Sequence, residues 1–278
     1  MRTSPPSWSA ARLDYALATS REEQRAALAI YLPVNYPNRA ASREALLLAA
    51  EHADVVELGV PHHTSPMDGP VIRKAAAQAL AGSDGFQMRD LFAAAVELTA
   101  RTSTALVAMS YWEPIRSYSP RAFTRELAAA GGAGVLVADL PPHAAPLWHE
   151  TAAEAGLYTV ALAPPHASSA RLAELGATTT GMLYAPATGL TGTQRPLSPY
   201  LPRLVRRLRE ATGLPVATGI GISSPQQAAQ VAGFSDAVVI GSAVIRRMHS
   251  QPDAPAPAAA AACRDFAQAV RQARRPAA

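Results

Sequence analysis

The chain has 278 residues, of which 49% are apolar and 17% charged, so it can bury one large core. No apolar run reaches the roughly 20 residues of a membrane span, and the first residues lack the continuous apolar segment of a signal peptide. Cys263 is the single cysteine and cannot form an internal disulfide, which is typical of a reducing compartment. We therefore expect a cytoplasmic protein with no membrane partner.

The net charge of +4 comes almost entirely from arginine, because Lys74 is the only lysine. Four arginines gather in the segment LPRLVRRLRE, whose leucines and valine would form the buried side of the same helix. This pattern is typical of a solvated helix face. No aromatic interleaving or DNA-reading motif accompanies it, so we expect no nucleic-acid partner. The positive charge favours an anionic substrate.

Short apolar runs alternate with amphipathic segments along the chain. After a first helix at residues 7–28, we predict strands at 27–34, 55–60, 104–111, 134–140, 158–163, 182–185, 215–218 and 237–240. The intervening helices are predicted at 42–52, 70–81, 88–101, 120–130, 144–155, 168–175, 201–211 and 225–232. This alternation predicts an α/β fold, a closed (β/α)8 TIM barrel with an extra N-terminal helix, and the alternative is an open doubly wound sheet.

Residues 1–250 are expected to form this single barrel domain. After Met248 the composition changes to QPDAPAPAAAAA, a Pro/Ala-rich stretch typical of a spacer, before a last helix near residues 263–274. Residues 251–278 are therefore either a long connection to the eighth barrel helix or a disordered tail, and the sequence leaves both open.

The stretch ADVVELGVPHHTSPMDGP carries the two candidate catalytic acids, Glu57 and Asp68. Glu57 lies within a predicted buried strand, where burial raises the pKa of a carboxylic acid toward neutrality, and that is how a general acid–base group is made. Asp68 follows on the loop before a helix, so both acids can face one substrate from two sides. The alternatives are a structural ion pair for Glu57 and a turn or helix cap for Asp68.

Two glycine-rich loops close the predicted barrel. TGIGISSP at residues 218–225 follows the seventh strand, and IGSA at 240–243 follows the eighth. Glycines let backbone N–H groups approach an anion, and loops after strands seven and eight are the usual phosphate site of such barrels. A third segment, TGLTG at 188–192, includes Thr191 and suits either a phosphate contact or a closing lid.

In chain order, these motifs resemble the tryptophan synthase α subunit family. The matching segments are ADVVELGVP with DGP, YWEPI at 111–115, ADLPP at 138–142, TGLTGT at 188–193, TGIGISSPQQ at 218–227 and VIGSAV at 239–244. They stand in family order and span about residues 13 to 250. The resemblance implies retro-aldol cleavage of indole-3-glycerol phosphate to indole and glyceraldehyde 3-phosphate, and no cofactor is expected.

The resemblance also assigns roles to individual residues. Glu57 matches the glutamate that handles the proton at indole C3, and Asp68 matches the aspartate that holds the indole N–H. The predicted substrate-binding residues are Tyr31, Tyr184, Thr191, Gly192, Ile220, Gly221, Gly241 and Ser242. Gly192, Gly221, Gly241 and Ser242 match phosphate-binding positions, Ile220 borders the indole, and the two tyrosines match aromatic residues near the substrate. Pro61 and Asp139 lie in segments that face the β subunit.

Departures from the family pattern cluster in the loops that signal to the β subunit. Thr64 stands where the family has an aspartate, Glu113 where it has an asparagine, and Ala138 where it has a proline. The two acids are kept while these loops differ. We therefore hypothesise that the lyase chemistry survives and that regulation by a β subunit, or affinity for it, is altered.

Two other functions stay open on the sequence. One is a non-catalytic barrel subunit that regulates a β-type partner. The other is a related phosphate-binding barrel lyase with a non-indolic substrate, for which Glu113 near the pocket mouth leaves room. His62 and His63 are not expected to bind a metal, because adjacent histidines on one loop rarely share an ion and no cysteine lies nearby. Trp112 is expected to pack near the barrel rim.

Overall fold

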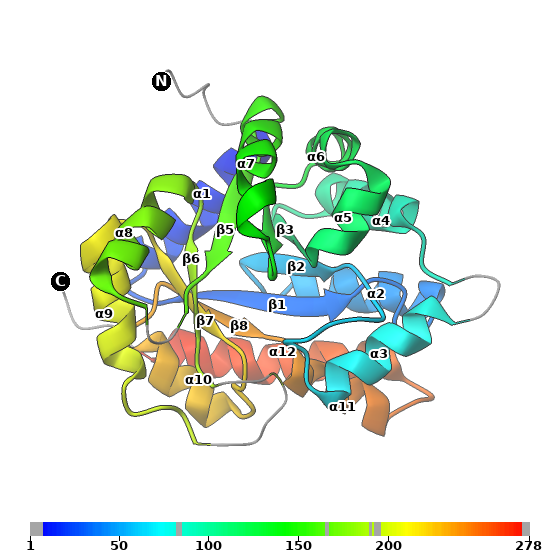
Figure 1. The fold of residues 1–278 in the computed structure, drawn as a ribbon. Coiled ribbons are helices and arrows are strands. Elements are labelled where there is room, and N and C mark those ends of the chain that lie inside the picture. The colour runs from blue at the N-terminus through cyan, green and yellow to red at the C-terminus, as the bar shows by residue number, and fades with distance from the viewer. Residues whose placement is uncertain (1–7, 82–84, 165–166, 189–190, 192–195, 274–278) are drawn as a thin grey trace.

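The computed structural model describes residues 8–81, 85–164, 167–188, 191 and 196–273 (Figure 1). Its eight strands are all parallel and close into a barrel in chain order, with β8 pairing β1. They are β1 Ala27–Pro33, β2 Val55–Gly59, β3 Ala105–Ser110, β4 Gly134–Val137, β5 Tyr158–Leu162, β6 Leu183–Pro186, β7 Val216–Gly219 and β8 Ala237–Ile240. The predicted (β/α)8 barrel is therefore confirmed.

Helix α1, Trp8–Glu22, precedes the first strand and ends before the predicted residue 28, because the chain turns through Gln24 with φ +55°. The other helices are α2 Arg39–Ala50, α3 Pro70–Leu80, α4 Met88–Arg101, α5 Trp112–Tyr118, α6 Pro120–Ala129, α7 Ala145–Glu154, α8 Ser169–Thr178, α9 Leu201–Thr212, α10 Pro225–Ala232, α11 Ser242–Ser250 and α12 Pro255–Gln272. A short 3-10 helix, η1, spans Pro142–Ala144. Of these helices in the described part of the chain, none is long and apolar enough to span a membrane.

The C-terminal segment differs from its predicted form. Helix α12 starts at Pro255, so most of the stretch expected to be a spacer is helical. Proline is tolerated in the first turn because its missing N–H is not needed there, and alanine is the best helix former. The small side chains of Ala258, Ala259 and Ala262 are buried, and α12 packs against α2, α10 and α11. It thus fills the place of the eighth barrel helix. Residues 274–278 lie outside the described residues.

Two short helices were not predicted. Helix α5 begins directly after β3, and α11 begins directly after β8, so neither has a polar loop before it to mark its start. Both lie at the carboxyl ends of the strands, the face where barrels of this kind hold their active sites. Their N-termini therefore point toward the region in which the predicted site residues gather.

Candidate active site

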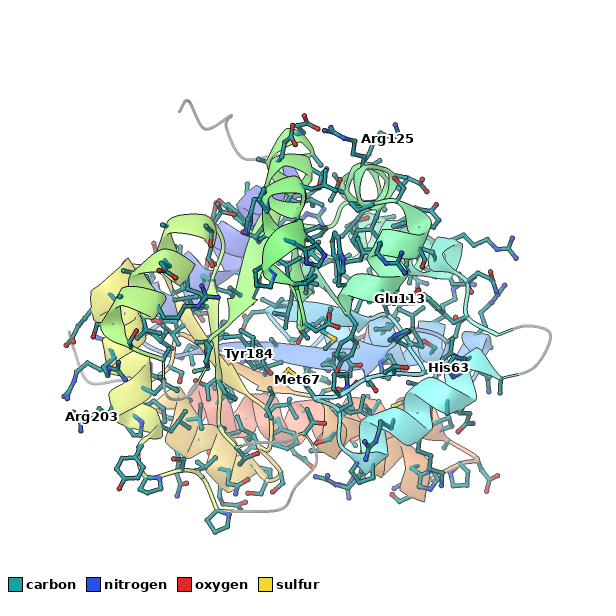
Figure 2. The ribbon with its side chains drawn as sticks, viewed as in Figure 1. His63, Met67, Glu113, Arg125, Tyr184 and Arg203 are labelled. Carbon is teal, nitrogen blue, oxygen red and sulfur yellow. The ribbon has the colours of Figure 1, made fainter. Side chains whose placement is uncertain are left out.

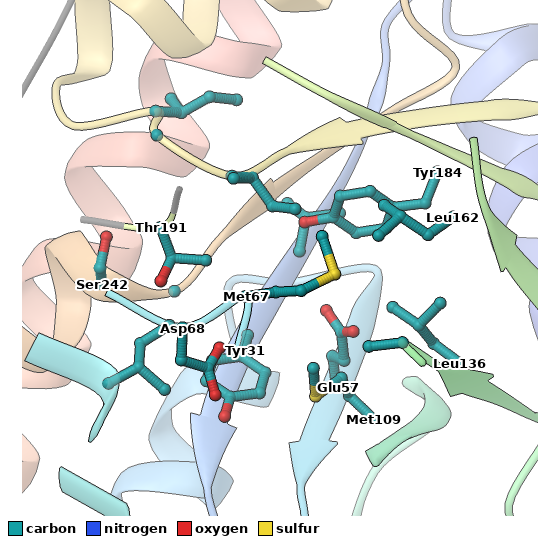
Figure 3. A pocket seen from close by; sticks show the side chains of 17 residues that line it. Tyr31, Glu57, Met67, Asp68, Met109, Leu136, Leu162, Tyr184, Thr191 and Ser242 are labelled. Carbon is teal, nitrogen blue, oxygen red and sulfur yellow. The ribbon is translucent and has the colours of Figure 1, made fainter. Parts of the chain in front are cut away.

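A cavity of about 610 Å³ opens at the carboxyl ends of the strands (Figure 3). All the predicted catalytic and substrate-binding residues that the structure describes line it: Tyr31, Glu57, Asp68, Tyr184, Thr191, Ile220, Gly221, Gly241 and Ser242. Gly192 lies outside the described residues. Met67 and Tyr184 lie near the centre of the ring of helices, whereas Arg125 and Arg203 lie at its periphery (Figure 2). Residues spread over most of the chain thus meet around one small volume.

Glu57 reaches the cavity from the middle of β2. The parallel register places it beside Tyr31 on β1 and Val107 on β3, and every residue of β2 is buried. Only 6% of Glu57 is exposed. Burial, with a smaller contribution from the charge of Asp68, raises the pKa of Glu57 to about 8. At neutral pH this carboxyl group therefore carries a proton that it can donate.

Asp68 enters from the loop between β2 and α3. A turn, in which its N–H donates to the Ser65 carbonyl at 3.2 Å, brings its side chain over the cavity. Burial raises the pKa of Asp68 to about 6, against the opposing influence of the Tyr111 and Ser65 hydroxyls and the Arg73 charge. Both hydroxyls are buried beside Asp68, and each lowers the pKa of Asp68 because it favours the ionised carboxylate. Asp68 is thus mainly ionised at neutral pH while Glu57 is mainly protonated.

Two tyrosines form opposite walls of the cavity (Figure 3). Tyr31 on β1 packs against Gly241, and Tyr184 on β6 packs so closely against Gly219 that a Cβ atom there would overlap the phenol oxygen. Burial raises the pKa of both hydroxyl groups well above 10, so both stay neutral. The strand-end glycines therefore make room for the aromatic walls.

Apolar side chains that the sequence analysis did not single out complete the middle of the cavity: Met67, Ile72, Met109, Leu136, Leu162, Ile222 and Val239. Several come from strands far apart in sequence. For the residues that lie on strands, the alternation of side chains predicts which ones face inward. Only the closed barrel shows that they share one space. This apolar middle suits a flat apolar ring.

The opposite end of the cavity is made of backbone. Ile220 and Gly221 both have positive φ angles, +59° and +100°, which turn the chain sharply before α10. Ser242 is the first residue of α11, where free N–H groups and the helix dipole favour an anion. No lysine or arginine is among the described residues that line the cavity. A phosphate group would therefore be held here by backbone N–H groups and hydroxyls.

Thr191 joins this end of the cavity to the loop that carries Asp68. The N–H of Gly69 donates to the Thr191 hydroxyl at 2.5 Å, although the two residues are 122 positions apart. The segment after β6 thus contacts the segment after β2 directly beside Asp68. This hydrogen bond ties the position of Thr191 to that of the loop that carries Asp68.

The residues predicted to face a partner lie at the rim. Pro61 is buried at the end of β2. The exposed Asp139 accepts a hydrogen bond from the Trp112 N–H at 2.6 Å and so caps α5. Trp112 packs edge to face on Trp148, with ring centroids 6.1 Å apart, which confirms its predicted packing role.

His62 Nδ1 lies 3.8 Å from the Glu113 carboxylate. Within the described chain, no group of three or more His, Cys, Asp or Glu side chains is placed to hold a metal.

A closed (β/α)8 barrel with two buried acids of unequal pKa, facing a backbone-lined anion site, defines an acid–base enzyme with a phosphorylated substrate. A family model described as "Tryptophan synthase alpha chain" matches residues 17–274. The chain therefore belongs to the tryptophan synthase alpha chain family.

Individual relatives agree with this assignment. The chain is 43% identical to the tryptophan synthase alpha chain of Streptomyces coelicolor, over 87% of this chain and 89% of that one. It is 40% identical to the alpha chain of Mycobacterium avium, over 85% of this chain and 87% of that one. A solved chain of Mycobacterium tuberculosis tryptophan synthase superposes with a TM-score of 0.86 at 36% identity, over 94% of this chain and 98% of that one.

Proposed function

We propose that this chain cleaves indole-3-glycerol phosphate to indole and glyceraldehyde 3-phosphate by acid–base chemistry. The single observation that carries the proposal is that two buried carboxyl groups line the same cavity, Glu57 with its pKa raised to about 8 and Asp68 with its pKa raised to about 6. Neutral pH lies between their two pKa values, so one enzyme form supplies both a proton donor and a negative charge.

The proposed reaction has two proton transfers, both by Glu57, and one C–C bond cleavage. Glu57 donates its proton to C3 of the indole ring, which leaves positive charge spread toward N1, and the Asp68 carboxylate accepts the N1–H hydrogen bond and offsets that charge. The Glu57 carboxylate then takes the proton of the adjacent glycerol hydroxyl. The C–C bond breaks, its electrons restore the aromatic ring, and the hydroxyl carbon becomes the aldehyde. Glu57 ends protonated, as it began.

The cavity supports this arrangement at both ends. The apolar side chains of Met109, Leu136 and Leu162 suit the indole ring, and Gly221 and Ser242 at the backbone-lined end suit the phosphate. Tyr31, Tyr184 and Ile220 would border the indole ring, whereas Thr191 and Gly241 would lie near the phosphate.

The first prediction concerns activity. Purified protein incubated with indole-3-glycerol phosphate should release indole, and Glu57→Gln should lower kcat by about a thousandfold or more because the variant can neither donate nor accept the proton. Asp68→Asn should lower kcat/KM by about a hundredfold. Glu44→Gln, at an exposed position on α2, is the matched control and should leave the rate unchanged.

Two outcomes separate the alternatives. Wild-type protein that releases no indole, even with a β subunit present, would favour the phosphate-binding lyase with a non-indolic substrate. A chain that releases no indole but changes the rate of an added β subunit would favour the non-catalytic regulator. An active Glu57→Gln variant would remove Glu57 from the mechanism.

We further propose that the chain works in the cytoplasm and associates with a tryptophan synthase β-type subunit through the rim that carries Pro61 and Asp139. The support is the family membership and the position of both residues on loops at the carboxyl face. Coupling to that partner is proposed to be altered, because Thr64 and Glu113 replace the residues that the family has in two of these loops.

A further inference from the structure

A second cavity, of about 990 Å³ counted to its open mouth, lies outside the barrel between α7 and α8. Helix α7 packs against α6 and β5, whereas α8 packs against α9, and β5 and β6 cross the space between the two helices (Figure 1). Ala161 and Leu162 on β5 are only half-buried. In a barrel of this kind the outer face of a strand is normally covered by helices. Here part of that cover is missing.

The second cavity shares a wall with the catalytic one. Ala138 and Leu162 line both of them. The pairing of β4 with β5 extends only to Leu136 and Val160, so beyond that point the two strands have no hydrogen-bonded ladder between them. The wall is therefore a few side chains thick at the place where it borders the apolar middle of the catalytic cavity. A molecule on one side of it touches residues that a molecule on the other side also touches.

Two buried polar atoms at this cavity have no hydrogen-bond partner, the Thr179 hydroxyl and His149 Nδ1. Both residues line the cavity, and Thr179 is 5% exposed. An unpaired buried donor or acceptor costs free energy, which a ligand that supplies the partner would recover.

The cavity lining has no net charge. Arg171 and Glu174 form an ion pair with each other at 3.0 Å, and both are more than half exposed. Burial lowers the pKa of His149, so the ring is neutral at neutral pH. The rest of the lining is mostly aliphatic, and Trp148, only 2% exposed, packs behind it. An anionic or cationic ligand would find no unpaired countercharge among these groups, whereas a neutral aromatic molecule would fit both their apolar and their polar parts.

We propose that the cavity between α7 and α8 is a second ligand site, for a neutral aromatic molecule of one or two rings that carries a hydrogen-bonding N–H or O–H group. Its occupant acts on the catalytic cavity through the shared residues Ala138 and Leu162. By linkage, a ligand in the catalytic cavity changes the affinity of the second site by the same factor. This site does not depend on which reaction the catalytic cavity performs.

The test is a fluorine NMR titration of the full chain with 5-fluoroindole. We expect a bound signal from this cavity, separate from any signal of the catalytic cavity, whose dissociation constant rises at least tenfold in Thr179→Val and in His149→Phe, because each variant removes one polar partner. Thr151→Val is the matched control on α7, since the Thr151 hydroxyl already bonds to the Trp148 carbonyl at 3.0 Å and does not line the cavity. It should leave the signal unchanged. Ala145→Phe, which fills the cavity from the start of α7, should also abolish the signal and serves if another variant fails to fold.

Methyl signals of Ala138 and Leu162 should shift with the same midpoint as the bound fluorine signal. The proposal is overturned if no bound signal responds to Thr179→Val, His149→Phe or Ala145→Phe, or if the two methyl signals do not move as that signal grows. A separate bound signal that is insensitive to these variants would report the catalytic cavity. Its absence alone would count against the proposed function and leave the second site in place.

Discussion

At the scale of single residues, the two acids differ because their surroundings differ. Glu57 lies within a fully buried strand, where burial and the negative charge of Asp68 raise its pKa. Asp68 sits on a loop, where the Tyr111 and Ser65 hydroxyls and the Arg73 charge oppose the effect of burial. The same chemical group thus has a pKa of about 8 in one place and about 6 in the other.

The raised pKa of Glu57 predicts a pH-dependent cost in stability. Its ordinary value is 4.5, so between about pH 5 and pH 8 the unfolded chain binds fewer protons at this group than the folded one does, and the free energy of unfolding falls as pH rises. Glu57→Gln has no charge to lose. We expect the variant to be more stable than wild type by about 2–4 kcal/mol at pH 8 and nearly equal at pH 5.

Urea unfolding followed by circular dichroism at both pH values measures this difference. Glu44→Gln removes an exposed carboxylate and should track wild type throughout. Equal stabilities of Glu57→Gln and wild type at pH 8 would mean that Glu57 is solvated or paired in the folded protein, and the proton-donor role would lose its physical basis.

The sequence allowed prediction of the residues whose local pattern is unusual, such as an acid inside an apolar strand or glycines at strand ends. It did not reveal Tyr111 and Ser65 beside Asp68, because a tyrosine after a strand and a serine before a proline are ordinary local patterns. Leu136 and Leu162 were missed as cavity residues for a different reason. They lie on β4 and β5, and only closure of the barrel brings those strands opposite β8 and β1.

At the scale of elements, the end of β7 holds the Tyr184 wall in place. Gly219→Ala would push its new methyl group into the Tyr184 phenol ring, and that ring would have to move into the catalytic cavity. We therefore expect KM for the phosphorylated substrate to rise at least tenfold with a smaller change in kcat. Gly233→Ala, at the residue that follows α10, is the matched control, because a methyl group there meets only the Gln230 carbonyl, at 3.3 Å. Steady-state kinetics that do not distinguish the two variants would contradict this account of Tyr184.

The C-terminal helix was the least predictable element, because proline and alanine repeats are common both in spacers and in helices that start with proline. Residues 255–262 are helical because, as a helix, they pack against α10 and α2. In a (β/α)8 barrel the eighth helix covers the seam between the last strand and the first. Helix α12 packs against β1 and the flanking helices at that seam.

Phe266→Ala tests the contribution of α12. Phe266 is 4% exposed, so the substitution should lower the free energy of unfolding by about 3–4 kcal/mol through lost burial and the cavity that remains. Gln268→Ala, two residues further along and exposed, should change it by less than about 0.5 kcal/mol. Thermal unfolding of the full chain measures both. A Phe266→Ala variant as stable as wild type would mean that α12 detaches from the barrel in solution.

At the scale of the whole molecule, the carboxyl face of the barrel carries every feature of the proposed function. The loop with Asp68 contacts Thr191 through Gly69, and the same loop contacts α5 through His62 and Glu113. Asp139 caps α5 from the loop after β4. These contacts thus join the segments that follow β2, β3, β4 and β6. A partner that binds this rim would act on Asp68 without touching the substrate.

The contacts at the rim predict how this chain responds to a β subunit. Glu113 is engaged within its own chain, by Arg116 and His62 at 3.8 Å and by the Ser117 hydroxyl at 2.6 Å, and Thr64 offers no charge to a partner. We expect a tryptophan synthase β subunit to raise the rate of indole release by this chain less than about threefold. The double variant Thr64→Asp with Glu113→Asn, which restores the residues that the family has at these positions, should respond at least fivefold more strongly.

Titration of the β subunit against each chain, with indole release as the readout, measures both responses. Arg125→Ala, on α6 away from these contacts, is the control. Strong stimulation of the wild-type chain would show that the altered loops still couple, and that the Glu113 contacts open when the partner binds.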